Sequence, residues 1–438
     1  MSEIKGSFFK REKYLFWTFF AVYFILGLVF VFLSKFWTDE NWYLGGSWLI
    51  ANGEVPFRDF FSHHNPLQLY VYAVPQYLFG PSLIVGRLTS LLFMMLNFVL
   101  VWRLARKLGG RTSALIAGGL LISNLFVIYY FTTLSYRVLE VFLMLVFFTV
   151  LLGDWKDSIK YPLAVLPISL VVGIRYPIDF VSGLLVLYLA FVAYRNWQKK
   201  RVVLISLSVA GLSLGLIMLP FIVMARDQFF FSTVAFNFLT PSYWVDFGIT
   251  SPPGIIDRIY HLLTIQSGVF QNFYAVAAIL FALLFYLISK VVTGKVNIKE
   301  LAAKNQNLVF LLIFIVLYEM FCLAAPQSTV SLRVFSLGVT AIVAGVGLAR
   351  VMAAIKDKSA TLLLYGLIIG LIILTPFAQY AQGNEARPTL TWQKTEMKYI
   401  SDVANKVAGY TEEGDRILTF TPAFVIQAGR ELMPGTTM

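Results

Sequence analysis

Charged residues are scarce in this chain of 438 residues. They make up 13% of the sequence, whereas 58% is hydrophobic and the mean hydropathy is +0.75. Soluble domains carry nearly twice that share of charge, at about 25%, and they avoid the large apolar patches that this composition would expose. The composition therefore excludes a disordered chain, a collagen-like chain and a compact soluble enzyme. The single cysteine, Cys322, excludes an intrachain disulfide.

The local motifs of several enzyme classes are also missing. The sequence has no glycine-rich phosphate loop, no Ser-His-Asp arrangement and no nucleotide-binding fingerprint. Only three histidines occur, and no His-x-x-x-His or Cys-x-x-Cys pattern accompanies them. The adjacent pair His63-His64 is a weak metal signal, because neighbouring histidines on regular structure rarely bind one ion. The third, His261, lies in another predicted loop on the same side of the membrane.

Long apolar runs are what the sequence has in abundance. About 20 residues of helix cross a hydrocarbon core, and runs of this kind recur along the whole chain. They predict an all-α polytopic membrane protein with about 11 transmembrane helices. The spans are expected near residues 14–33, 83–104, 112–130, 136–152, 161–174, 177–194, 202–222, 272–289, 308–324, 331–350 and 361–379.

The distribution of basic residues predicts the orientation. Lys10, Arg11 and Lys13 precede the first span, which we interpret as a retained anchor with a cytoplasmic N-terminus. Alternating from there, more than half of the lysines and arginines fall inside, and most acids fall outside. The net charge of +12 is therefore mainly a topology signal. This net charge is therefore not evidence of a nucleic-acid partner.

The three longest connecting segments all fall on the outer side, at residues 34–82, 223–271 and 380–438. Within the first of them, residues 67–80 are expected to form a helix at the outer interface. Residues 1–379 then form the transmembrane domain. Residues 380–438 form an outer C-terminal segment, a small α/β lobe that we expect to be incomplete because no closing element follows its strand-like residues 417–420.

Several ionisable residues fall in or near the predicted spans, where charge is expensive and usually functional. All of them lie in the outer half on this topology. Snorkelling at helix ends would account for any one alone. Together they predict a polar cavity that opens outward, and arginines beside acids favour an anionic headgroup such as a phosphate. The residues are Arg87, Arg137, Glu140, Arg175, Asp179, Glu319 and Arg333.

The first outer segment carries the candidate catalytic acids Asp39, Glu40 and Asp59. Adjacent residues on a helix point about 100° apart, so Asp39 and Glu40 cannot both face one atom. One would act on a substrate while the other positions it or holds a cation. Asp59, further along the same segment, would return to the same site.

Four short motifs occur in a familiar order in the first 110 residues. They are Asp39-Glu40, His64-Asn65-Pro66-Leu67, Gly86-Arg87-Leu88-Thr89 and Ala105-Arg106-Lys107-Leu108. In this order they resemble the start of GT-C glycosyltransferases of the protein O-mannosyltransferase and aminoarabinose-transferase type. Asn65 and Thr89 stand where that pattern has proline.

The resemblance implies an enzyme in the plasma (inner) membrane that moves a hexose or pentose from a polyprenyl-phosphate carrier, with inversion. The acceptor would be a glycan, a lipid or a protein on the outer face. Asp39 would be the general base, and Glu40 would orient the acceptor or a divalent metal cation, with His63 and His64 as further candidate ligands. Arg333 and Arg175 would bind the carrier phosphate. Arg87 is a third candidate, for which a structural role at the junction of loop and span is the favoured alternative.

Two other functions stay open from the sequence. A transporter or flippase of lipid-linked sugars would use the outward cavity as its binding site, although the chain lacks the repeated halves common in transporters. A non-catalytic subunit could keep the same fold. Membrane lipids and a lipid-linked sugar are expected partners in each case.

Overall fold

The computed structural model describes residues 2–175, 199–247, 305–324, 330–355, 357–381 and 387–433, together with Gly254 and Gly294. The predicted spans at 177–194 and 272–289, and with them Asp179 and His261, lie outside the described residues. The chain divides into two compact units. Unit 1 comprises Met1–Phe30, Met94–Tyr130 and Gly254–Arg387, and unit 2 comprises Val31–Phe93, Phe131–Pro253 and Pro388–Met438.

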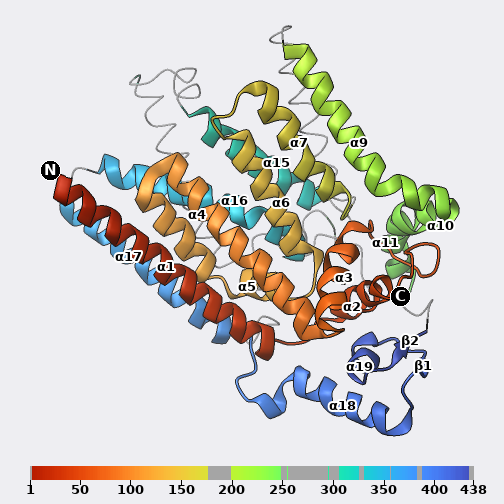
Figure 1. Ribbon diagram of the computed structural model, residues 1–438. Helices are drawn as coiled ribbons and strands as arrows, with labels where there is room; N and C mark the ends of the chain where they lie inside the picture. Colours follow the sequence, from red (N-terminus) through yellow and green to blue (C-terminus); the bar gives the residue numbers. More distant parts are fainter. Residues whose placement is uncertain are drawn as a thin grey trace. The chain divides into compact units, whose positions relative to one another are not determined.

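Apolar helices long enough to cross a membrane recur through both units (Figure 1). Five pass this test among the described residues, and a sixth is added if the pair α5 and α6, bent by 104°, counts as one broken span. This confirms a multi-pass membrane protein, whereas the total of about eleven stays a prediction. The helices are α1 (Ser2–Leu33), α4 (Leu83–Ile122), α5 (Leu125–Thr132), α6 (Tyr136–Leu151), α9 (Lys200–Met224), α16 (Val330–Ala354) and α17 (Lys358–Ala381).

Unit 1 packs its helices through close backbone approaches. A Cβ added at Gly345 in α16 would lie 2.5 Å from the backbone oxygen of Ser113 in α4. Gly110 interrupts α4 with φ 82° and ψ −166°, a conformation that glycine adopts without a steric penalty. The helix α15 (Gln306–Ala324) packs against α16 in the same unit.

Unit 2 carries the first outer segment, which is helical as predicted. Helix α2 (Thr38–Ala51) packs against α3 (Leu67–Phe79), and α6, α7 (Asp157–Val172) and α9 pack in succession. Three short elements follow α9, namely α10 (Arg226–Phe230), the π-helix η3 (Phe231–Ala235) and α11 (Phe236–Asp246). Buried Phe57, in the loop between α2 and α3, packs with Phe221 and Phe229 and so fastens that loop to α9 and α10.

Helix α3 exposes apolar side chains and buries polar ones. Val74, Tyr77 and Phe79 are 60%, 73% and 77% exposed, whereas Gln68 and Gln76 are 1% and 0% exposed. A helix against water shows the opposite pattern. The exposed face suits contact with lipid, which agrees with the interface helix predicted for residues 67–80.

The C-terminal segment of unit 2 packs against α2. It contains the 3₁₀-helix η4 (Trp392–Lys394), α18 (Glu396–Tyr410), β1 (Arg416–Ile417), α19 (Pro422–Gln427) and β2 (Glu431–Leu432), with the two strands parallel. The Ala423 amide donates to Asn41 Oδ1 at 3.2 Å, and the Phe36 amide donates to Glu396 Oε2 at 3.0 Å. One bond therefore reaches the first turn of α2 at Asn41, and the other reaches the residue before its N-cap Trp37.

Candidate active site

Asp39 lies in the first turn of α2, where unpaired backbone N–H groups favour a negative charge. Trp37 starts the helix in an extended conformation (φ −93°, ψ 135°). Burial raises the pKa of Asp39, the positive charges of Arg137 and Arg175 lower it, and the charge of Glu40 raises it. The net result is a raised pKa, as expected of a carboxyl group that serves as a base near neutral pH.

The two arginines share one aromatic ring. The Arg137 Cζ lies 4.7 Å from the centroid of the Tyr136 ring and 4.1 Å from that of Trp37. The Arg175 Cζ lies 4.7 Å from the same Tyr136 ring, and its guanidinium donates to the Tyr136 hydroxyl. Two guanidinium groups held on one ring, both acting on Asp39, form a cationic site of the kind that binds phosphate.

Local turns bring these arginines to the site. The 104° bend between α5 and α6 places Tyr136 and Arg137 at the start of α6. Arg175 follows the end of α7, which is tied to the start of α3 by the bond from Asn65 Nδ2 to the Val172 oxygen at 2.6 Å. A proline at position 65 has no such donor. The departure from the family pattern at Asn65 therefore has a local function in this chain.

Both carboxylate oxygens of Glu40 accept hydrogen bonds from other groups of the protein. Its carboxylate accepts from Arg87 Nε at 2.9 Å and Arg87 Nη2 at 2.7 Å, from the Leu134 amide at 2.9 Å and from the Trp37 amide at 3.0 Å. The side chains of Glu40 and Arg87 are both 0% exposed. This geometry favours a structural role for the pair over the predicted contacts of Glu40 with an acceptor and of Arg87 with a phosphate.

Asp59 lies in a separate ion pair. Its carboxylate accepts from Arg58 at 2.7 and 2.8 Å and from the Val55 amide at 2.7 Å. The bond from Arg58 is the main reason why the pKa of Asp59 falls to about 2. The charges that shift the pKa of Asp39 are those of Arg137, Arg175 and Glu40. The charge of Arg175 thus acts on Asp39, whereas Asp59 is paired with its neighbour Arg58.

Arg333 lies on α16 in unit 1, and its side chain is outside what the structure describes. Its assignment to the carrier phosphate stays a prediction.

His63 and His64 lie in an aromatic setting. The His64 ring stacks on Tyr43 at 6.2 Å and meets the edge of Tyr136 at 5.1 Å between centroids. Burial lowers the pKa of His63 to about 4 and that of His64 well below 6.5, so both are neutral at pH 7.

The predicted divalent cation does not fit these residues. Both carboxylate oxygens of Glu40 are used by Arg87 and by backbone amides. In the part of the chain that the structure describes, no three His, Cys, Asp or Glu side chains gather as ligands.

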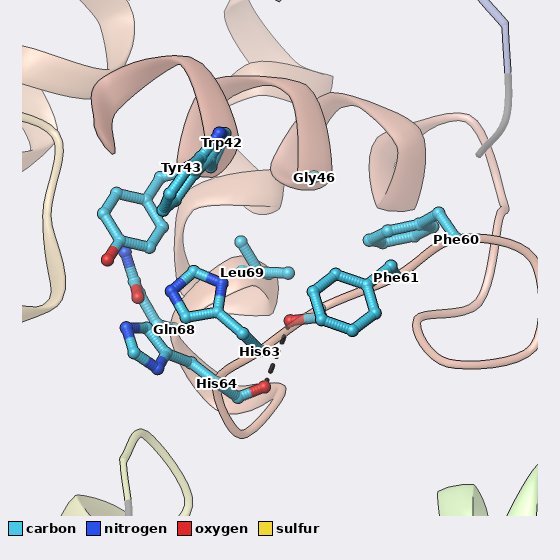
Figure 2. Close-up of a pocket in the computed structure, with 10 residues that line it drawn as sticks. Trp42, Tyr43, Gly46, Phe60, Phe61, His63, His64, Gln68 and Leu69 are labelled. Atoms are coloured by element: carbon cyan, nitrogen blue, oxygen red, sulfur yellow. Dashed lines mark hydrogen bonds between the residues drawn. The ribbon is translucent and has the colours of Figure 1, made fainter. Parts of the chain in front are cut away.

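A small pocket adjoins the site (Figure 2). Tyr43 lines the pocket and lies four residues after Asp39 on α2. Residues four apart share one face of a helix, so the pocket neighbours Asp39. The pocket has a free volume of about 20 Å³, room for a water molecule or a hydroxyl group. Its lining is Trp42, Tyr43, Gly46, Phe60, Phe61, Ser62, His63, His64, Gln68 and Leu69.

Comparison with known proteins adds independent information. Residues 63–223 match the family described as dolichyl-phosphate-mannose-protein mannosyltransferase. The crystal structure of ArnT from Cupriavidus metallidurans bound to undecaprenyl phosphate is similar to this chain with a TM-score of 0.64 and 15% identity. The alignment covers 95% of this chain and 85% of ArnT. The chain has the fold of GT-C glycosyltransferases.

A second GT-C protein extends the comparison. The archaeal oligosaccharyltransferase AglB from Archaeoglobus fulgidus, solved with an inhibitory peptide and a dolichol-phosphate, aligns with a TM-score of 0.52 and 13% identity. That alignment covers 90% of this chain and 58% of AglB. No curated protein sequence matches the chain significantly.

Two features of this site have no assignment from the sequence. Arg137 was recognised only as a charge within a span, and Tyr136, which carries both guanidinium groups, was not singled out. The signal that would have found them is Ser135-Tyr136-Arg137 followed by Glu140, a polar cluster that opens an otherwise apolar run. Their meeting with Arg175 depends on tertiary packing and leaves no local pattern.

Proposed function

We propose that this protein transfers a sugar from a polyprenyl-phosphate carrier to an acceptor hydroxyl on the outer face of the membrane. The observation that carries the proposal is the pair of guanidinium groups, those of Arg137 and Arg175, that both contact the Tyr136 ring and whose charges act on the carboxyl group of Asp39. The GT-C fold supports it, since ArnT and AglB were solved with undecaprenyl phosphate and dolichol-phosphate. The distribution of basic residues supports the orientation with a cytoplasmic N-terminus.

The chemistry follows from the positions of these charges. Asp39 accepts the proton of the acceptor hydroxyl as its oxygen attacks the anomeric carbon. The bond from that carbon to the phosphate oxygen breaks, and the electron pair leaves with the carrier phosphate. Arg137 and Arg175 stabilise the growing negative charge there. A single displacement of this kind inverts the configuration at the anomeric carbon.

The direct test uses purified protein in lipid nanodiscs with a panel of polyprenyl-phosphate hexoses and pentoses. We expect release of the sugar-free carrier phosphate together with a glycosylated acceptor or free sugar. Movement of the intact carrier between leaflets in proteoliposomes, with the sugar still attached, would instead establish a flippase and overturn the proposal.

The arginines are expected to bind the carrier through its phosphate. Arg137→Gln and Arg175→Gln should each weaken the binding of sugar-free undecaprenyl phosphate roughly 10- to 100-fold, because each removes a charge-assisted hydrogen bond. The measurement is titration of the lipid into protein in nanodiscs. Arg58→Gln, which removes a half-exposed arginine paired with Asp59, is the matched control and should leave the affinity unchanged. Equal affinity in all three variants would contradict the phosphate assignment.

The pH dependence should report the carboxyl group of Asp39. A base must be unprotonated, and burial raises the pKa of Asp39 above 3.8. The value of kcat/KM is therefore expected to rise with pH through a pKa above the ordinary aspartate range, and to be lost as the pH falls through that value. A rate that stays constant down to about pH 4, near the ordinary pKa of aspartate, would be inconsistent with this base.

A further inference from the structure

Gln68 is a buried polar residue for which the fold has no evident use. It is 1% exposed in the first turn of α3, and among the described residues neither its amide nitrogen nor its amide oxygen has a hydrogen-bond partner. Leaving such an atom unpaired costs about 1–3 kcal/mol. Unpaired buried groups of this kind are expected where a ligand supplies the missing partner.

The amide of Gln68 belongs to the pocket next to Asp39. Figure 2 shows the amide beside the Tyr43 ring and the imidazole rings of His63 and His64. The pocket therefore offers one donor and one acceptor from Gln68, surrounded by aromatic rings and two neutral histidines.

The charge of the pocket limits what it can take. None of its lining residues is a carboxylate, so an ammonium group would have no counter-charge there. Two cationic groups, Arg137 and Arg175, contact the Tyr136 ring on which His64 packs. Within this lining a cation would have no counter-charge, and an anion would have no cationic partner. A neutral hydroxyl matches an amide that both donates and accepts.

The position of the pocket identifies which substrate brings that hydroxyl. The sugar of a lipid-linked donor is bonded directly to the phosphate, so its hydroxyls lie within a few bonds of whatever binds the phosphate. His64 connects the two places, because it lines the pocket and packs on Tyr136 at 5.1 Å.

We propose that Gln68 is a specificity-determining residue that binds a hydroxyl group of a neutral donor sugar in the pocket formed by Trp42, His63 and His64. This inference rests on the proposed function and goes beyond it, since it assigns a neutral sugar and the residue that selects it. An amino sugar would not satisfy the same pocket.

Helix α3 supplies a matched control. Gln76 lies on the same helix and is 0% exposed, but its amide is satisfied by Ser82, with bonds of 3.0 Å to the oxygen and 2.7 Å from the amide nitrogen of that residue. Gln68→Leu and Gln76→Leu are the same chemical change at two buried sites of one helix. A loss of stability alone would affect both variants, whereas recognition of the sugar distinguishes them.

The experiment measures the binding of undecaprenyl phosphate and of undecaprenyl-phosphate mannose, glucose and galactose, with the monodeoxy and amino analogues of the tightest binder. In the wild type we expect one deoxy position to weaken binding roughly tenfold, the worth of one or two hydrogen bonds. In Gln68→Leu that penalty should disappear, so the two losses do not add. Gln76→Leu should keep the penalty, and sugar-free carrier should bind all three proteins equally.

The outcomes separate this inference from the proposed function. If wild-type protein fails to bind sugar-free carrier, the proposed function fails. If the carrier binds but Gln68→Leu keeps the full deoxy penalty, or if the amino analogue binds as tightly as the neutral sugar, only the assignment of Gln68 is overturned. Failure of every hexose to bind more tightly than the sugar-free carrier overturns it as well.

Discussion

Asp39→Asn is expected to reduce kcat by about 10³-fold, because removal of a positioned general base costs between about 10² and 10⁴. The amide has nearly the shape of the carboxyl group but cannot accept the proton of the acceptor. Binding of sugar-free undecaprenyl phosphate should be retained, since the phosphate is assigned to Arg137 and Arg175. The measurement compares release of carrier phosphate with lipid binding in the same nanodisc preparation.

Asp402→Asn is the matched control for this experiment. Asp402 is 51% exposed and pairs with Lys398 on α18, so its substitution should leave both kcat and lipid binding unchanged. Wild-type turnover by Asp39→Asn would remove Asp39 from the reaction. Loss of lipid binding in parallel with turnover would instead assign the residue to carrier recognition.

Among the single substitutions proposed, Glu40→Gln should lower the stability of the fold most. It leaves the guanidinium of Arg87, which is 0% exposed, without a counter-charge. Breaking a buried pair in this way costs about 3–5 kcal/mol. Thermal unfolding in detergent is the measurement, and Asp402→Asn, which breaks an exposed pair, should cost no more than about 0.5 kcal/mol.

A double variant distinguishes a structural role of Glu40 from a role in the reaction. Replacing a buried ion pair by apolar side chains is often neutral, so Glu40→Leu combined with Arg87→Met should recover a large part of the lost stability. We expect turnover to recover with it. A double variant that is stable but inactive would show that Glu40 contacts a substrate, which contradicts the structural role assigned here.

The helices and the acidic pair could be predicted because their signals are local sequence patterns. Hydropathy located the long apolar helices α1, α9, α15, α16 and α17, and the interface helix expected over residues 67–80 is α3, which exposes apolar side chains. The Asp39-Glu40 pair was found because it begins a helix directly after a span. Each of these signals lies within one continuous stretch of the sequence.

What could not be predicted depends on contacts between distant parts of the chain. Glu40 and Arg87 are 47 residues apart, and each on its own looks like a functional charge in a membrane protein. Only their mutual burial shows that they satisfy each other. In the same way, Arg137 and Arg175 are recognised as one site only because both contact the Tyr136 ring.

The bond between α19 and α2 has a consequence for biosynthesis. Asn41 and Ala423 are 382 residues apart, so the helix that bears the proposed base is translated among the first elements and meets this packing partner among the last. While the chain is still being inserted, α2 lacks that support and its first turn is incompletely held. A nascent chain that has not yet reached residue 423 therefore lacks this bond, and α2 gains it only after synthesis has passed that point.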